Sequence, residues 1–591
     1  MNRYLCSLGL IVIIGIIQLE PAAAAAASGD AEFARVADNF LAGYLAWRPQ
    51  TGTALGLHEY DGKITDFGRA SLAAERARLK TVDRLLARWP VSQLSPTAYQ
   101  DLRLLQATVR GELFKFDTLR SYSRNPMTYA GAFDVNIYIK RDFAPLEERL
   151  RSTVAILQQV PHVLADARAN LEANLAKPFV ETAIEVANGS ADFLGKDLVD
   201  AFKGVTNATL MAEFNAADQR AVAELRTFVK WLEQERLSHA HAPYALGRKN
   251  YARMLRNDEF LTISPERVLQ LGLAELQREQ TNFAEAARQI DPSKNPSVVF
   301  REIQKDHPTE QALIPDTRKN LEAIRQFLID RKIVSFPTDV RVRVEETPQF
   351  ARATSFASMD TPGPFETKAT EAYYYVTPPD AKDTPAKKDE WLTAFNYYTT
   401  DVVSIHEAYP GHYLQFLHLN ASPASRLRKI LNSYAFVEGW AHYAEQMALD
   451  EGFGLDHYDA PTPADRLRAA KYRLAQSDEA LLRLCRLCVS VRIHCQGMTV
   501  EAATKFFMDN CYYEPKPARQ EAIRGTFDPG YLYYTLGKLQ ILQLRRDWQA
   551  QEGAAYSLQR FHDELLNHGA PPIRLLREIM LRDRTRLDDE F

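Results

Sequence analysis

Apolar residues along most of this chain recur every three or four positions, with polar residues between them. That spacing places the apolar side chains on one face of an α-helix, so it predicts a mainly α-helical protein. Some predicted helices also begin at capping residues, for example Ser264 before Pro265, because proline suits the first helical position. The longest predicted helices span Ala31–Trp47, Leu72–Arg88, Ala98–Phe116, Pro145–Asn174, Ala212–His239, Pro265–Gln289, Arg318–Asp330, Ala464–His494 and Tyr531–Gln551.

Strand-like patterns are confined to a short central region. Asp339–Thr347 alternates valines with charged residues, and Thr370–Thr377 carries a run of tyrosines that ends in Val376. Ala353–Met359, between them, is a third extended segment. Together they predict a small β-sheet just before the motif at His406, with one edge available to the backbone of a substrate.

The organisation of the chain is simple. It contains no internal repeat and no clear linker, so residues 28–591 are predicted to form a single helical domain, with two lobes around a cleft as one arrangement. The formal net charge is −4 over 591 residues, and no basic stretch is interleaved with aromatics. These features exclude an electrostatic nucleic-acid binder. They carry no signal for an oligomeric state.

The first 27 residues read as a signal peptide. Arg3 precedes a largely apolar run at Leu5–Leu19, and alanines follow at Ala22–Ala27. A charged start, an apolar core and small residues at a cleavage site are typical of a secretory signal. The alternative is an uncleaved anchor, but the run is shorter than the roughly 20 residues of a spanning helix. We expect an exported protein, periplasmic or extracellular, without stable membrane insertion after cleavage.

Four cysteines follow the predicted signal, at Cys485, Cys488, Cys495 and Cys511. The first two lie on a predicted helix rich in leucines, which favours buried apolar packing of the thiols. A disulfide between this helix and Cys511 is an alternative in an exported protein, and a zinc knuckle is a weaker one.

The stretch with the clearest chemistry is His406-Glu407-Ala408-Tyr409-Pro410-Gly411-His412. In the common zinc-peptidase helix, two histidines lie four residues apart, and a glutamate after the first addresses the attacking water. Here the second histidine comes six residues later, about 120° away from the first on a regular helix. Pro410 and Gly411 offer a place for a π-like bulge that absorbs the two extra residues.

A third ligand is predicted on a second helix. Glu438 follows His412 by 26 residues, which is enough for a turn and a returning helix. Two histidines and one glutamate leave a fourth zinc position for water. Glu445, two turns after Glu438, could orient a ligand histidine, and His442 is a competing ligand. Gly439 would permit a close approach of another backbone.

These two motifs resemble a known family. His406-Glu407-Ala408-Tyr409-Pro410-Gly411-His412-Tyr413-Leu414-Gln415, followed by Phe436-Val437-Glu438-Gly439-Trp440-Ala441, is similar to the bacterial family called domain of unknown function 885. The resemblance covers most of the chain after the signal and is strongest over Pro348–Arg545. It implies a zincin-like fold, similar in layout to helical oligopeptidases and metallocarboxypeptidases.

Two further positions gain meaning from this resemblance. His494 stands where relatives have the histidine of Asp-x-Gly-x-His, although Ser490 and Arg492 depart from that pattern. Tyr534 and Gly537 match a Tyr-x-x-Gly motif. The alternative is that the histidine belongs to the core and the tyrosine only packs.

The sequence therefore predicts a zinc-dependent peptidase. His406, His412 and Glu438 would bind Zn²⁺, Glu407 would act as general base, and Tyr534 and His494 would stabilise the oxyanion. The predicted substrate is a short peptide. Two alternatives remain open: a metal-dependent hydrolase of another amide or ester, and a non-catalytic metal- or peptide-binding protein of the envelope.

Overall fold

The computed structural model describes residues 20–348, 352, 356–583 and 585. The segment read as a signal peptide therefore lies mostly outside the described residues, as does the start of the extended segment at Ala353. Within the described chain, no helix combines the length and the apolar character needed to cross a bilayer. The protein is mainly α-helical, as the periodicity predicts.

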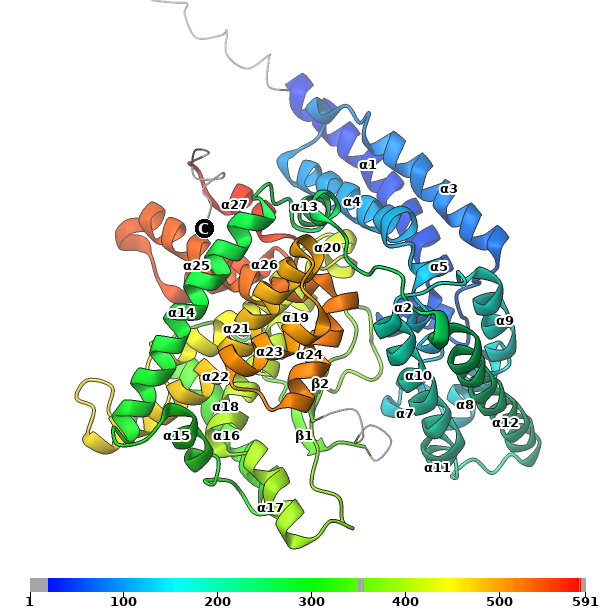
Figure 1. The fold of residues 1–591 in the computed structure, drawn as a ribbon. Helices are drawn as coiled ribbons and strands as arrows, with labels where there is room; N and C mark the ends of the chain where they lie inside the picture. Colours follow the sequence, from blue (N-terminus) through cyan, green and yellow to red (C-terminus); the bar gives the residue numbers. More distant parts are fainter. Residues whose placement is uncertain (1–19, 349–351, 353–355, 584, 586–591) are drawn as a thin grey trace, which may run out of the picture.

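The helices between residues 20 and 231 lie on one side of the molecule in Figure 1, coloured blue to dark green. They are α1 (Glu20–Trp47), α2 (Pro49–Ala54), α3 (Arg69–Leu86), α4 (Pro96–Phe114), α5 (Ser121–Arg124), α6 (Met127–Ala130), α7 (Ile137–Lys140), α8 (Leu146–Leu157), α9 (Val160–Asn170), α10 (Lys177–Asp192), α11 (Val199–Ala201) and α12 (Ala208–Trp231). The single helix predicted over Pro145–Asn174 is wrong: it is divided into α8 and α9, and Pro161 lies in the first turn of α9, where its missing N–H is tolerated.

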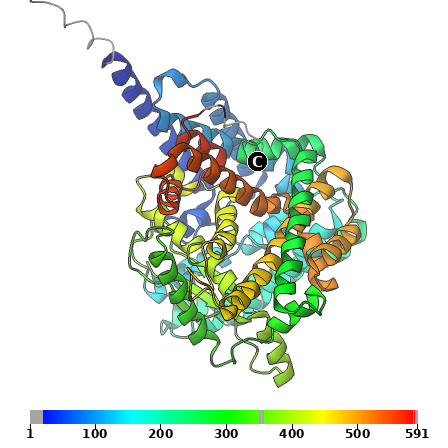
Figure 2. The same cartoon turned by 90° about the vertical axis from the view of Figure 1, so that its left-hand side faces the viewer.

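Later helices, green to red, form the other side, and they face the viewer when the molecule is turned by 90° (Figure 2). They are α13 (Arg248–Glu259), α14 (Pro265–Ile290), α15 (Pro296–Ile303), α16 (Leu313–Asp330), α17 (Pro385–Ala394), α18 (Tyr397–Glu407), α19 (His412–Ala421), α20 (Arg426–Ile430), α21 (Tyr434–Asp450), α22 (Pro463–Gln496), α23 (Val500–Cys511), α24 (Pro515–Phe527), α25 (Tyr533–Glu552), α26 (Leu558–Asn567) and α27 (Ile573–Met580).

One small sheet forms in the predicted region, from β1 (Arg343–Glu346), β2 (Ala357–Asp360) and β3 (Tyr373–Val376). The strand order is β1-β3-β2, with β1 parallel and β2 antiparallel to β3. Val344 and Tyr374 pair in register and are both buried against the later helices. The pairing leaves β2 at one edge of the sheet.

Each side of the molecule has its own apolar packing. One core joins α6–α12, and two others join the later helices around α22 and α21. A fourth core spans both sides, because Leu102 and Leu105 of α4 pack with Leu427 and Ile430 of α20. The buried ion pair between Arg428 and Asp101, at 2.6 Å, reinforces this junction.

The four described cysteines are all free thiols, and Cys485, Cys488 and Cys511 are buried. They pack in the core around α22, as the leucine-rich pattern predicts. The alternative of a disulfide to Cys511 is therefore not what the structure contains.

Candidate metal centre

The turn between α18 and α19 brings the two motif histidines together. α18 ends at Glu407 and α19 begins at His412, so the chain breaks the helix rather than widening it, and the predicted π-like bulge is wrong. The Gly411 N–H donates to the carbonyl of Ile405 at 3.0 Å, which folds the turn back over the end of α18. A Cβ on Gly411 would lie 1.7 Å from the carbonyl oxygen of His406, so only glycine fits there.

Helix α21 packs against this turn and supplies the third side chain. The indole of Trp440 donates to the carbonyl of Pro410 at 2.9 Å, which ties the turn to α21. At the preceding residue of α21, a Cβ on Gly439 would lie 2.6 Å from the backbone of Gly537. The predicted close approach at Gly439 is therefore confirmed, and it is α25 that approaches. Glu438 directly precedes Gly439 and Trp440 on this helix.

Three ligand atoms converge at this point. His406, His412 and Glu438 each offer one atom, and these atoms lie within 4.8 Å of one another. Both imidazole Nε2 atoms are 3.5 Å from Oε2 of Glu438, and the two rings are perpendicular at an interplanar angle of 89°. The side chains are between 7% and 19% exposed, so the cluster is largely but not completely screened from bulk water.

The donor set fits a divalent metal, and zinc in particular. Among the described residues, Oε2 of Glu438 is buried without a hydrogen-bond partner, and such groups normally have one. Burial disfavours a charged His406, but the carboxylates of Glu438 and Glu445 outweigh it and raise its pKa to about 10. The cluster therefore favours positive charge, which a metal ion supplies. Two imidazoles and a carboxylate are ligands that Zn²⁺ accepts.

Glu445 orients His406 from behind the cluster, as predicted. Its Oε1 accepts a hydrogen bond from Nδ1 of His406 at 2.7 Å, so Nε2 is the ring nitrogen that faces the cluster. Its Oε2 lies 3.1 Å from Nδ1 of His442, and Arg483 lies 3.3 Å from Oε1. Burial and the charge of Lys538 lower the pKa of His442 to about 3. His442 therefore belongs to the Glu445 network and is not one of the three grouped ligands.

Glu407 lies at the end of α18, half-buried, and is not part of the three-ligand group. Its negative charge, together with burial, raises the pKa of Tyr374 in β3. Ser404, one turn before Glu407, donates to the Tyr374 hydroxyl at 3.3 Å. Glu407 therefore lies near the sheet, as expected from the position of the strands in the sequence.

Tyr534 also lies near the cluster. Burial raises its pKa, and the charge of Glu438 raises it further. The guanidinium groups of Arg483 and Arg486 lie 5.8 and 5.3 Å from its ring centroid. Tyr434, which we did not predict, packs against Tyr534 with ring centroids 5.7 Å apart. Its position four residues before Glu438 on the same helix was the available signal.

The predicted role of His494 does not fit the structure. Its Nε2 donates to the carbonyl of Gly525 at 2.8 Å, and its Nδ1 accepts from the backbone N–H of Leu246 at 3.3 Å. The ring is 2% exposed and stacks on Tyr251. Both nitrogens are already bonded to the backbone, so neither is free to stabilise an oxyanion. His494 instead joins α22 to the segment before α13 and to α24.

Comparison with known proteins agrees with the family resemblance. The model of the family described as "Bacterial protein of unknown function (DUF885)" matches residues 49–580, and the chain belongs to this family. No curated protein matches the chain.

Two solved structures share the fold. A "putative lipoprotein of unknown function" from Shewanella oneidensis is 24% identical, with a TM-score of 0.75, over 93% of this chain and 100% of that one. A "putative lipoprotein" from Colwellia psychrerythraea is 18% identical, with a TM-score of 0.78, over 95% and 100%. At these identities the likeness shows the fold alone.

Proposed function

We propose that this member of the DUF885 family is an exported, zinc-dependent peptidase that cleaves short peptides. The convergence of His406, His412 and Glu438, with ligand atoms within 4.8 Å of one another, carries the proposal. The buried Glu445 behind His406 strengthens it, because a carboxylate bonded to the far nitrogen of a histidine is typical of zinc ligands.

Each residue of the site has a separate role in hydrolysis. His406, His412 and Glu438 hold the metal, which when bound supplies Lewis acidity to the reaction. Glu407 is not needed as a ligand, so it takes the proton of the attacking water and passes it to the leaving amine. Tyr534 donates a hydrogen bond to the oxygen that gains negative charge. The open edge of β2 would pair with the backbone of the peptide.

The proposed location is the cell envelope. The predicted signal peptide supports export, and the two similar structures are described as lipoproteins. A helical peptidase of the envelope with a recessed metal site is suited to short peptides rather than to folded proteins.

The test compares the parent protein with Glu407→Gln and with the matched control Glu501→Gln, which changes an exposed glutamate of α23. Each zinc-loaded protein is incubated with a defined pool of short peptides, and products are identified by mass spectrometry. We expect the parent and the control to cleave and Glu407→Gln to lose cleavage while retaining stoichiometric zinc. Full hydrolysis by zinc-loaded Glu407→Gln would refute the assignment of the base.

A further inference from the structure

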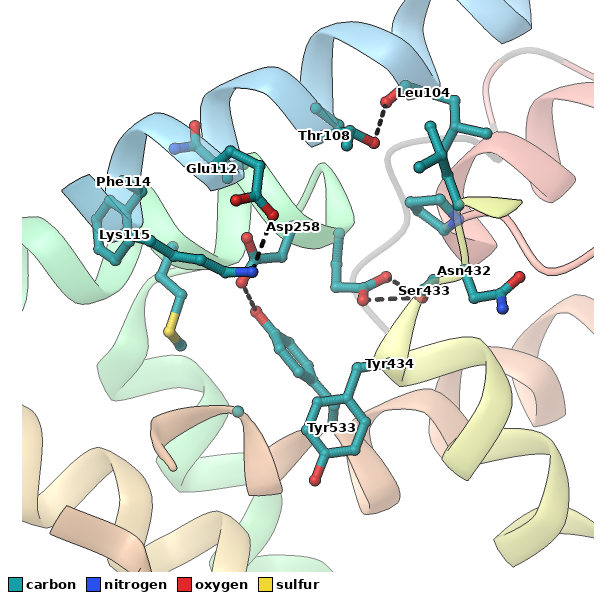
Figure 3. Close-up of a pocket in the computed structure, with 18 of the residues that line it drawn as sticks. Leu104, Thr108, Glu112, Phe114, Lys115, Asp258, Asn432, Ser433, Tyr434 and Tyr533 are labelled. Atoms are coloured by element: carbon teal, nitrogen blue, oxygen red, sulfur yellow. Dashed lines mark hydrogen bonds and ion pairs between the residues drawn. The ribbon is translucent and has the colours of Figure 1, made fainter. Parts of the chain in front are cut away.

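A cavity of about 500 Å³ reaches the first turn of α21, the helix that carries Glu438. Its walls come from α4, from the end of α13, from the start of α21 and from the segment Pro529–Tyr533 before and within α25. Figure 3 shows Glu112, Lys115 and Asp258 on one side, with Tyr434 and Tyr533 opposite them. The volume falls within the roughly 300–1,000 Å³ of small-molecule sites.

The cavity and the metal centre share helix α21. Tyr434 lines the cavity at the first turn of this helix, and Glu438 follows one turn later, roughly 6 Å along the axis. The ring of Tyr434 packs on Tyr533 in the cavity wall and on Tyr534 beside Glu438, with centroids 5.9 and 5.7 Å apart. The ring of Tyr434 therefore links the wall of the cavity to the surroundings of Glu438.

Two of the three acidic side chains in the wall already have polar partners. Glu112 pairs with both Arg48 and Lys115, the latter at 2.9 Å. Glu259 accepts hydrogen bonds from Ser433 and from the N–H of Ala435 at the start of α21. Burial raises the pKa of Glu259 to about 8, so it is largely neutral at pH 7 and acts as a helix cap.

Asp258 is different. Its only hydrogen bond, among the described residues, is from the Tyr533 hydroxyl at 3.3 Å, and none of them places a cationic nitrogen within 4 Å of it. Burial raises its pKa to about 6, and the nearby Lys115, already bonded to Glu112, opposes this shift only in part. Asp258 is half-buried and has no ion-pair partner among the described residues, so a ligand that supplies positive charge would stabilise its carboxylate.

We propose that this cavity binds a primary ammonium group of the peptide, with Asp258 as its partner and the Tyr533 hydroxyl holding that carboxylate in place. The inference rests on the proposed function and refines it. The ammonium is either the free N-terminus, which would make the protein an exopeptidase that trims from that end, or a lysine side chain. The ring of Tyr434 and the side chains of Leu104 and Met254 provide apolar surface for the rest of the residue.

Binding separates this inference from catalysis. Glu407→Gln protein, loaded with zinc, is titrated calorimetrically with tetra-alanine, with its N-acetylated form, with its C-amidated form and with an N-acetylated tetrapeptide that contains one lysine. We expect acetylation to weaken binding by about 10-fold or more, because a charge-assisted hydrogen bond is lost, and amidation to change it less than twofold. Recovery of affinity by the lysine peptide would identify the side chain as the source of the ammonium.

The variant Asp258→Asn in the same background tests the partner. We expect it to bind the free and acetylated peptides alike, and Asp258→Glu to retain part of the preference. Asp200→Asn is the matched control, because Asp200 is an exposed aspartate of α11 that does not line the cavity. This control should distinguish the free peptide from the acetylated one as the parent does. If Asp258→Asn does not fold, the comparison of peptides on the parent remains decisive.

Two outcomes would overturn the inference: equal binding of all four peptides, or full discrimination by folded Asp258→Asn. These two outcomes can be told apart from a failure of the proposed peptidase function. A protein that prefers free ammonium groups but never hydrolyses a peptide would keep the site and lose the peptidase. One that cleaves acetylated and free lysine-less peptides equally would keep the peptidase and lose the site.

Discussion

Replacing Glu445 by glutamine tests how the metal centre is built. The carboxylate is fully buried and is bonded to Nδ1 of His406 at 2.7 Å, while its other oxygen faces His442. Glutamine keeps the size of the side chain and one carbonyl oxygen but removes the charge. The change therefore weakens the orientation and basicity of His406 without touching a ligand.

The magnitude follows from the geometry. A hydrogen bond to a buried charged group contributes about 1.5–3 kcal/mol, and loss of such a partner behind a zinc ligand typically costs about 10–100-fold in metal affinity. The two estimates agree, because a 10–100-fold loss of zinc affinity corresponds to about 1.4–2.7 kcal/mol. We expect zinc to bind Glu445→Gln about 10–100-fold more weakly than the parent, and peptide hydrolysis at limiting zinc to fall in proportion.

The assay is competition for zinc with a chromophoric chelator of known affinity, at fixed pH. Glu479→Gln is the matched control, because Glu479 is the other carboxylate that pairs with Arg483 but contacts no histidine of the cluster. It should bind zinc within twofold of the parent. Near-ultraviolet circular dichroism establishes that both variants are folded. Parent-like zinc affinity in folded Glu445→Gln would refute the reasoning.

Three further changes probe the turn, the corrected histidine and a buried acid. Gly411→Ala should lower the free energy of unfolding by about 2 kcal/mol and weaken zinc binding, because its Cβ would strike a carbonyl. The control Gly189→Ala, whose Cβ would meet no atom within 4 Å, should be neutral or stabilising. Equal urea midpoints for the two variants would contradict this. His494→Ala should lower the free energy of unfolding by about 2 kcal/mol or more, because two backbone groups lose their partner. Its zinc affinity should stay within twofold of the parent. A large loss of zinc affinity would restore a role for His494 at the metal. Burial holds the pKa of Glu259 near 8, above its unfolded value, so the folded state keeps a proton that the unfolded state releases as pH rises. The stability that this group contributes is fully present at acidic pH and is lost towards pH 8. In urea unfolding, the free energy of unfolding of Glu259→Gln should therefore fall less than that of the parent between pH 5 and 8. An equal fall in both proteins would argue against a raised pKa.

Much of the helical framework could be predicted because it depends on local pattern. α14 begins at Pro265 behind its Ser264 cap, as predicted, and α22 covers the predicted Ala464–His494. The failure at Pro145–Asn174 has a local reason, since Pro161 begins a new helix there. The three candidate ligands could also be found in the sequence, because histidines and acidic residues are common metal ligands and lie here at spacings that a turn can bridge.

What the sequence by itself determined is the chemistry available: which side chains can bind metal, which helices carry them and where a glycine or proline interrupts those helices. Tertiary structure decided how they meet. The break before His412 is fixed by the indole of Trp440 from another helix, and the position of Glu438 by the contact of Gly439 with Gly537. His494 lost its predicted role for the same reason, because its partners come from segments far away in the chain. Side-chain periodicity reports only on neighbours within a few turns, whereas burial and hydrogen bonding depend on which distant elements pack together.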